Sequence, residues 1–287
     1  MPDPARGRKA CEPSGCAAGA NPAAVGGSMV PILAYHDIDA AFRWGSLNPT
    51  IRQFESQMRY LKAEGFRTVS LAEAVEGRAG ERSVALTFDD GYDGLGRYAL
   101  PVLTRYGFSA TVFIVTGFVG RASRWDLNLR WLGGRHMDWA AVRNLDQAGI
   151  DIGSHTATHP NLVGVDAARV DREFRESKAE LEDVLGKQVA LLSYPFGQYN
   201  DQVKAAASSA GFRLACTIRP RRGDRADDPL SLKRFCIRSI DSLWDFRAKV
   251  RPGGPGLFQD WKEGFLSACN RSSLIARRRY DRQEDAA

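Results

Sequence analysis

The chain has 287 residues, of which 44% are hydrophobic and 26% are charged, close to the average of globular domains. Its 40 Lys and Arg outnumber its 34 Asp and Glu, and the resulting net charge of +6 is spread along the sequence. The one dense basic run, residues 277–279, is too short to indicate a nucleic-acid-binding surface. Apolar runs stay well below the ~20 residues of a membrane-spanning helix. We therefore expect neither a membrane span nor a nucleic-acid partner.

Both ends of the chain differ in composition from its centre. Residues 1–28 are rich in Ala, Gly and Pro and lack the apolar core of a secretory signal, so we expect a disordered leader, or translation from Met29, and a cytoplasmic protein. Residues 251–256 read RPGGPG and mark a second boundary. This division leaves 29–250 as the main domain and 251–287 as a C-terminal helical extension and tail.

Short apolar runs alternate with amphipathic stretches from residue 30 onward. Strands are expected at 30–35, 84–88, 110–115, 150–152, 189–194 and 212–218. Helices are expected between them, first from Asn48-Pro49 to Gly65 and then at 95–106, 138–147, 166–185 and 201–210. Residues 116–137 and 219–233 are expected to be loops. The repeated β-then-α order predicts an α/β fold with a parallel sheet.

Polar residues follow directly after four of the expected strands. These residues are His36-Asp37, Asp89-Asp90, His155 with His159, and residues 194–197. Because the C-terminal ends of parallel strands meet at one edge of a sheet or barrel, we expect these groups to share one site.

The residue types in this set are those of a metal site. Asp89 and Asp90 are adjacent, so an extended backbone directs them to different partners. Taken alone, the pair would favour a helix N-cap with an acidic first turn over a catalytic site. His155 and His159 are four residues apart, and Pro160 keeps the second outside a regular helix. Two histidines and one carboxylate form a ligand set that hydrolytic metal ions use, so the combination predicts a metal centre.

Three segments resemble the signature motifs of a known family. TFDDGY at 87–92 and HTATHP at 155–160 are similar to the first two motifs of the polysaccharide deacetylases, carbohydrate esterase family four with a NodB-homology domain, and SYPFG at 193–197 is similar to the third. The resemblance runs from about residue 30 to 239, which makes 29–250 the expected catalytic domain. It implies a distorted (β/α) barrel and a hydrolase that removes acetyl groups from N-acetylated sugars.

Carried over by position, the resemblance implies one divalent metal ion bound by Asp90, His155 and His159. Zinc is the expected ion, with Co²⁺ or Ni²⁺ as alternatives. Asp89 is then expected to be the general base that activates the attacking water.

The third motif implies further contacts and contains one departure. A backbone N–H near Phe196 is expected to stabilise the oxyanion, and Tyr194 is expected to contact the substrate or the oxyanion. Most relatives carry an arginine near Ser193 that orients the base, and this chain has none there. Arg234, from another part of the chain, is the candidate replacement.

The general acid is the second departure. The family's late histidine is missing, because no histidine follows His159. A branch of poly-N-acetylglucosamine deacetylases has an early histidine in a YHDI-like segment instead, and residues 35–38 match it. We therefore expect His36 to be the general acid, held as imidazolium by Asp37 or another carboxylate. The remaining histidine, His136, is expected to be exposed in a loop.

These inferences favour a metal-dependent N-deacetylase whose substrate is a glycan or glycolipid containing N-acetylhexosamine. Nothing in the sequence indicates a particular oligomeric state. Two alternatives stay open: a related metal-dependent amidase that acts on a small amide or imide, and a glycan-binding module without turnover.

Overall fold

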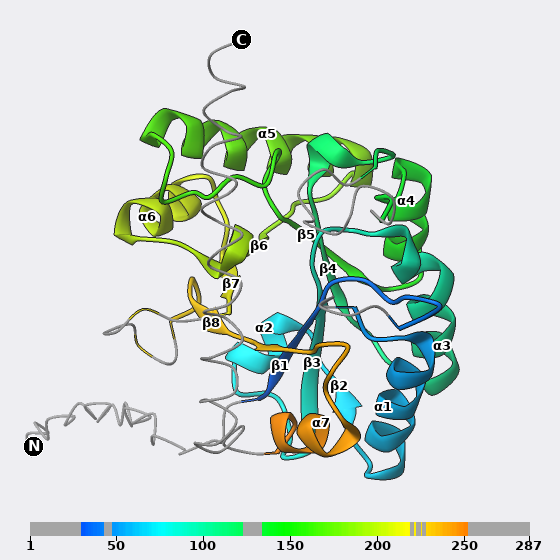
Figure 1. Ribbon diagram of the computed structural model, residues 1–287. Coiled ribbons are helices and arrows are strands. Elements are labelled where there is room, and N and C mark those ends of the chain that lie inside the picture. The colour runs from blue at the N-terminus through cyan, green and yellow to red at the C-terminus, as the bar shows by residue number, and fades with distance from the viewer. Residues whose placement is uncertain are drawn as a thin grey trace, which may run out of the picture.

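In the computed structural model, the strands of the described residues form one parallel sheet that curls into a barrel, and helices cover its outside (Figure 1). The structure describes residues 30–42, 48–122, 134–218, 221, 225 and 228–251. The expected leader at 1–28 and the extension beyond residue 251 lie outside the described residues. Within the described ranges, no helix has the length and apolar character needed to cross a membrane.

The strands are short and alternate with helices along the chain. The strands are β1 (Ile32–Tyr35), β2 (Arg67–Thr68), β3 (Ser83–Phe88), β4 (Thr111–Ile114), β5 (Asp151–Ser154), β6 (Leu191–Ser193), β7 (Leu214–Thr217), β8 (Leu232–Lys233) and β9 (Phe235–Cys236). The helices are α1 (Ile51–Ala63), α2 (Leu71–Val75), α3 (Leu100–Tyr106), α4 (Trp139–Gln147), α5 (Ala167–Leu185), α6 (Asp201–Ser209) and α7 (Leu243–Lys249). Single turns of other helix types occur at η1 (Leu95–Ala99), η2 (Thr116–Phe118) and η3 (Pro195–Gly197).

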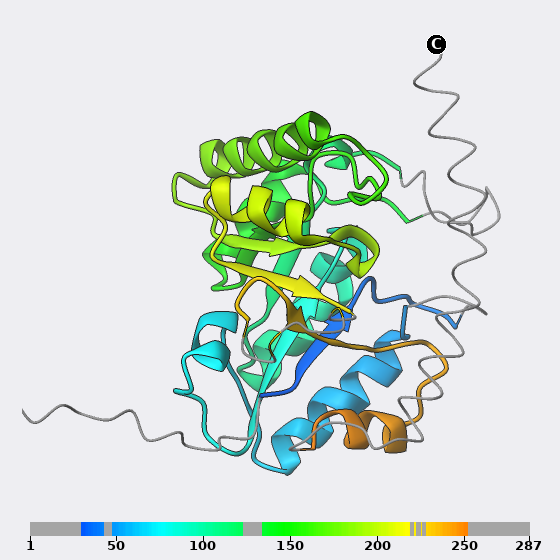
Figure 2. The ribbon, with the colours of Figure 1, turned by 90° about the vertical axis from the view of Figure 1, so that its left-hand side faces the viewer.

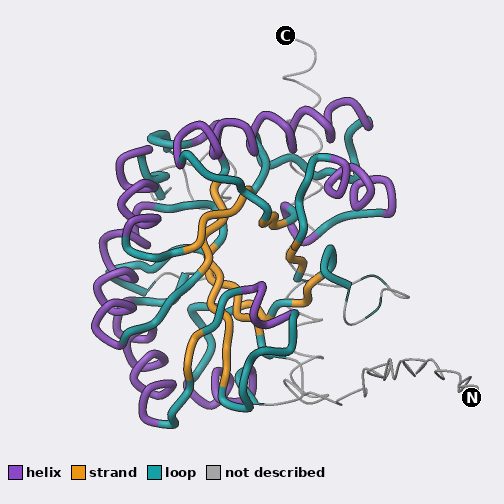
Figure 3. The backbone as a smooth tube through the Cα atoms, turned by 180° about the vertical axis from the view of Figure 1, so that it is seen from behind, coloured by secondary structure: helices purple, strands orange, loops and turns teal. Residues whose placement is uncertain are grey.

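One extended segment closes the barrel. The strand order is β8-β7-β6-β5-β4-β3-β1-β9, and β2 pairs with β3 outside this order. The two strands at the ends of the order, β8 and β9, are neighbours in sequence, with Arg234 alone between them. Because β8 pairs with β7 and β9 pairs with β1, residues 232–236 join the two edges of the sheet. Figure 3 shows the strands arranged around a common centre.

The two faces of the sheet have different neighbours. On the outer face, Leu33 and Phe88 share a hydrophobic cluster with Phe54 of α1. On the inner face, Phe113 and Cys216 belong to a cluster that draws side chains from strands on opposite sides of the barrel. Figure 2 shows α5 and α6 together over one part of the barrel and α1 beside α7 over another. Because the helices cover the outside of the barrel, the inner face and the C-terminal ends of the strands are available to form a site.

The predicted fold class is confirmed, and most predicted strands and helices are present. The prediction of a loop through residue 233 is wrong at its end, where β8 forms. The sequence reading also missed β2, α2, β9 and α7. These elements have two to seven residues, too few to show a clear hydrophobic period. The boundaries predicted at 29 and 250 stay a prediction.

Candidate active site

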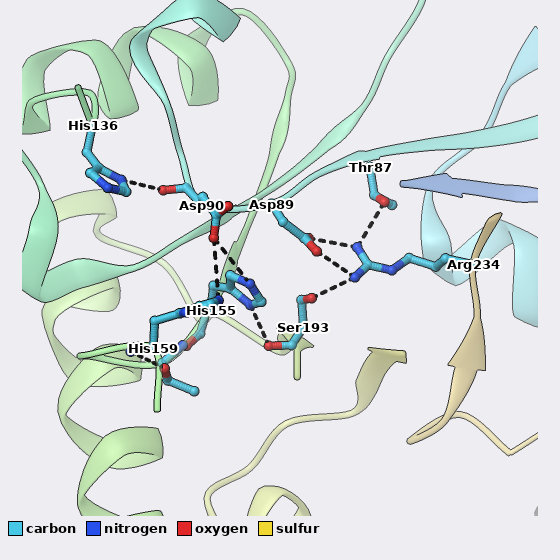
Figure 4. A network of polar contacts seen from close by, with 10 residues as sticks. Thr87, Asp89, Asp90, His136, His155, His159, Ser193 and Arg234 are labelled. Atoms are coloured by element: carbon cyan, nitrogen blue, oxygen red, sulfur yellow. Dashed lines mark hydrogen bonds and ion pairs between the residues drawn. The ribbon is translucent and has the colours of Figure 1, made fainter. Parts of the chain in front are cut away.

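The polar strand ends meet inside the barrel mouth, at the C-terminal edge of the sheet (Figure 4). Asp89 and Asp90 follow β3, His155 follows β5, Ser193 ends β6, and Arg234 joins β8 to β9. All five residues are buried. The parallel register explains the convergence, since each strand delivers its last residues to the same edge.

Asp90, His155 and His159 form a cluster with the dimensions of a metal site. Asp90 Oδ1 lies 3.6 Å from Nε2 of His155 and 3.5 Å from Nε2 of His159. One ligand atom from each residue lies within 4.8 Å of the other two. Ligands at tetrahedral angles on ~2.1 Å bonds would be roughly 3.4 Å apart. The three buried side chains therefore fit a divalent metal ion.

His155 is held in the orientation that such an ion needs. Its Nδ1 lies 2.7 Å from the carbonyl oxygen of Ser193, so Nδ1–H donates to that carbonyl and Nε2 faces the cluster. Burial lowers the pKa of His155, although nearby Asp89 opposes that shift. The imidazole is therefore neutral at pH 7, which is the form that binds metal ions.

Two of the metal-cluster residues adopt left-handed backbone conformations. The φ angle is 69° at Asp90 and 57° at His159, and Thr156 between the histidines has a φ of 68°. Such angles cost of order 1 kcal/mol or more each for residues other than glycine. Thr156 offsets part of this cost, because its Oγ1 accepts a hydrogen bond of 3.0 Å from the His159 amide.

His136 supports the conformation of Asp90. Its Nδ1 lies 2.8 Å from the Asp90 carbonyl oxygen (Figure 4). Its ring stacks on that of Tyr92, with 4.7 Å between the ring centroids. Burial lowers the pKa of His136 to about 4, so the ring is neutral and Nδ1–H is the donor. The prediction that His136 is exposed is wrong: it is 2% exposed, because residues 134–137 pack back against the turn that follows β3.

Glu173 of α5 supports the segment between the two histidines, and the sequence reading missed it. Its carboxylate accepts hydrogen bonds from the amides of Ala157, at 2.9 Å, and Thr158, at 2.8 Å, and from the Thr158 hydroxyl. The one available signal was its place in α5, where an acidic residue stands next to Phe174 on the buried face.

Asp89 points away from the cluster and pairs with Arg234. The guanidinium donates two hydrogen bonds of 2.7 Å, one to each carboxylate oxygen. It also donates to the hydroxyl of Thr87 at 3.1 Å and to that of Ser193 at 2.9 Å. The two neighbouring aspartates thus have different partners, as the extended strand predicted.

This pair sets the ionisation of both groups. Burial alone would raise the pKa of Asp89. The Arg234 guanidinium outweighs burial and holds that pKa well below its usual range, and the charges of His155 and His36 act in the same direction. The pKa of Arg234 is raised in turn, because attraction to Asp89 outweighs the effect of burial. Asp89 is therefore an ionised carboxylate, able to accept a proton, across the neutral pH range.

The candidate acid, His36, acts on Asp89 through its charge. It follows β1 and is half-buried. Asp37 is buried, and its carboxylate accepts a hydrogen bond of 2.8 Å from the Ile38 amide. That carboxylate lies against Gly94, where an added Cβ would come within 2.1 Å of Oδ1.

The two candidate residues of the third motif, Phe196 and Tyr194, have different neighbours. The Phe196 ring lies 4.7 Å from the ring of His159, and the residue has a left-handed φ of 59°. Tyr194 turns away: its hydroxyl donates to the Leu230 carbonyl at 3.1 Å and its ring stacks on Tyr199 at 4.8 Å. Tyr194 thus contacts Leu230 and Tyr199, and its predicted role as a substrate contact stays a prediction.

Comparisons with known proteins agree with this geometry. Residues 76–215 match the family model described as polysaccharide deacetylase. The chain is 30% identical over 215 residues to YxkH of Bacillus subtilis (strain 168), which is classed by name with the polysaccharide deacetylases; the match covers 73% of this chain and 72% of that relative. It is 27% identical to the poly-beta-1,6-N-acetyl-D-glucosamine N-deacetylase of Staphylococcus aureus (strain MRSA252), over 67% of this chain and 70% of the relative.

The fold is likewise similar to solved structures. The Streptococcus pyogenes deacetylase PplD, solved in complex with acetate, superposes with a TM-score of 0.66 at 25% identity. That match covers 78% of this chain and 98% of PplD.

Proposed function

The chain belongs to the polysaccharide deacetylase family, and on this basis we propose that it is a metal-dependent enzyme that removes N-acetyl groups from a glycan or glycolipid containing N-acetylhexosamine. The observation that carries the proposal is the buried cluster of Asp90, His155 and His159 beside the ionised Asp89. The likeness to the staphylococcal enzyme makes a poly-N-acetylglucosamine the first substrate to test.

Asp90, His155 and His159 would hold the divalent ion. When bound, that ion would supply Lewis-acid polarisation of the acetyl carbonyl and of the attacking water. Zinc is the ion that this carboxylate and imidazole set favours.

Asp89 would act as the general base. Each of its carboxylate oxygens accepts one bond from Arg234 and keeps a second lone pair for the water proton. Arg234 is thus proposed to fix the orientation of the base without blocking it. Because the pair is buried, the carboxylate cannot turn toward bulk solvent.

His36 would protonate the leaving amine. It lies at the barrel mouth near Asp89, whose negative charge favours the imidazolium form that can donate a proton. The nearby Asp37 would fix the backbone after β1 through its bond to Ile38. The backbone N–H of Phe196 is our candidate donor to the oxyanion.

An acetate-release screen tests the function. The substrates are N-acetylglucosamine oligomers and a panel of small amides and imides, each assayed with and without added Zn²⁺ or Co²⁺ and with a chelator. We expect acetate from the oligomers and complete loss of activity on chelation. Turnover of the small amides alone would favour the amidase alternative, and metal-loaded protein that binds oligomers without acetate release would be a binding module.

Two variants test the roles of the residues. His155→Ala should lower the bound metal measured by elemental analysis, and full metal content would remove it from the ligand set. Asp89→Asn should keep the metal and lose roughly 10²–10⁴-fold in kcat, the usual contribution of a general base. Unchanged kcat would remove Asp89 as the base.

A further inference from the structure

A second buried arginine, Arg238, stands near the barrel mouth, and no described residue balances its charge. Arg238 is 7% exposed, yet its guanidinium makes no hydrogen bond or ion pair with any described residue. The carboxylate nearest in sequence, that of Asp241, accepts a bond from the Arg238 backbone amide and pairs with Lys249 at 2.7 Å. Buried charges in proteins are normally paired, as Arg234 is with Asp89.

The sheet register places Arg238 beside the candidate acid. Ala34 of β1 is paired with Cys236 of β9, and the Ile237 amide continues the ladder by donating to the Ala34 carbonyl at 2.8 Å. His36 and Arg238 each stand two residues beyond this pair, just past the ends of β1 and β9, so continuation of the register brings them to the same place at the sheet edge. Both residues stand at the C-terminal edge of the sheet.

Strand alternation gives the direction of the Arg238 side chain. Ile237 is fully buried in the outer cluster with Phe246 of α7, so it faces the helices. Side chains alternate between the two faces of a strand, and the same alternation continued past the end of β9 gives Arg238 the inner face of Arg234 and Cys236. Figure 4 shows Arg234 reaching from this segment to Asp89. Arg238 lies four residues further along the chain, two inward-facing positions closer to the C-terminal edge of the sheet.

We propose that Arg238 binds an anionic group of the substrate, a carboxylate or a phosphate ester on a sugar next to the one that loses its acetyl group. The inference rests on the proposed function and names its substrate class, an acidic N-acetylated glycan. A guanidinium binds either oxyanion through two parallel hydrogen bonds, and its burial makes that pairing stronger than at an exposed site. The net charge of +6 also favours approach of an anionic glycan.

The test compares three N-acetylglucosamine oligomers of equal length: one neutral, one with a 6-phosphate on one sugar and one with a carboxylate there. The quantity measured is kcat/KM for acetate release by the metal-loaded protein. We expect wild type to prefer one acidic oligomer over the neutral one by roughly 10- to 100-fold, the range of a charge-assisted hydrogen bond. The phosphate and carboxylate arms identify which anion is recognised.

Variants assign the preference to Arg238. In Arg238→Gln the ratio of acidic to neutral kcat/KM should fall close to one, and in Arg238→Lys it should be intermediate, because the charge stays and the planar fork is lost. Arg213→Gln removes the same charge from an exposed position before β7, at the opposite edge of the sheet, and should keep the wild-type ratio. Thermal unfolding shows whether each variant is folded.

A binding measurement separates this inference from the proposed function. Inorganic phosphate titrated into wild type should bind at least about tenfold more tightly than into Arg238→Gln. Equal phosphate affinity, or equal kcat/KM on acidic and neutral oligomers in wild type, would overturn the role of Arg238 and leave the deacetylase proposal intact. Absence of acetate from every oligomer would overturn the proposed function, and the phosphate titration would then decide on Arg238 alone.

Discussion

Replacing Arg234 by Met should destabilise the protein strongly, because the change leaves Asp89 without its counter-charge. Arg234 is 1% exposed and Asp89 is 2% exposed, so water cannot take the place of the guanidinium. Methionine also removes the donors to Thr87 and Ser193. Removal of one partner of a buried ion pair typically costs about 3–5 kcal/mol in the free energy of unfolding.

The pH dependence of this loss has a defined sign. In wild type the pKa of folded Asp89 lies below its value in the unfolded chain, about 3.9. The pair therefore contributes its full stability above that pH, and the contribution is lost as the pH falls through the folded pKa. In Arg234→Met burial dominates and raises the folded pKa above 3.9. The free energy of unfolding should then decrease as the pH rises from about 4, by at most about 1.4 kcal/mol per pH unit.

Urea unfolding of the chelated protein between pH 4 and 8 measures both effects. Arg234→Met with Asp89→Asn serves as the matched control, because it removes the uncompensated charge and should recover stability and the wild-type slope. A loss below about 1 kcal/mol in the single variant, or equal pH slopes for wild type and the single variant, would refute the argument.

Three further predictions concern groups around the site. Glu173→Gln should weaken Zn²⁺ binding by roughly 10- to 100-fold, because the turn between His155 and His159 loses its charged hydrogen-bond acceptor. Competition with a chelating dye measures the affinity, and an unchanged value would show that the turn keeps its conformation without Glu173. Gly153→Ala should lower the free energy of unfolding by about 1–3 kcal/mol, because the new Cβ would lie 2.6 Å from the ring of Phe113, and an unchanged urea midpoint would contradict that. Burial raises the pKa of the Cys216 thiol to about 12, so a disulfide reagent at pH 8 should modify it in urea and not in native protein; fast native labelling would place it nearer the surface.

The sequence predicted where the site lies because parallel topology determines it. Once 84–88 and 150–152 are identified as strands, Asp89, Asp90 and His155 must reach the same edge of the sheet. The local chemistry of the two motifs then indicates a metal centre before any distance is known.

The remaining contacts depend on packing that no local pattern records. Arg234 is flanked by strands of two residues each in a charged stretch, so its inward direction follows only from closure of the barrel. Glu173 and His136 form hydrogen bonds with backbone groups of other segments. Such contacts produce no recognisable motif or residue spacing in the sequence. Tyr194 is the converse case, a residue inside a motif whose side chain packs elsewhere.

Closure of the barrel by residues 232–236 also bears on synthesis of the protein. The counter-charge of Asp89 follows it by 145 positions in the chain. A nascent polypeptide halted before residue 232 would carry an unbalanced carboxylate in its interior and two unsatisfied sheet borders, at β1 and β7. The ribosome must therefore release nearly all of the domain before Asp89 can pair with Arg234. Until then the free edges of β1 and β7 are open to pairing with strands of other chains.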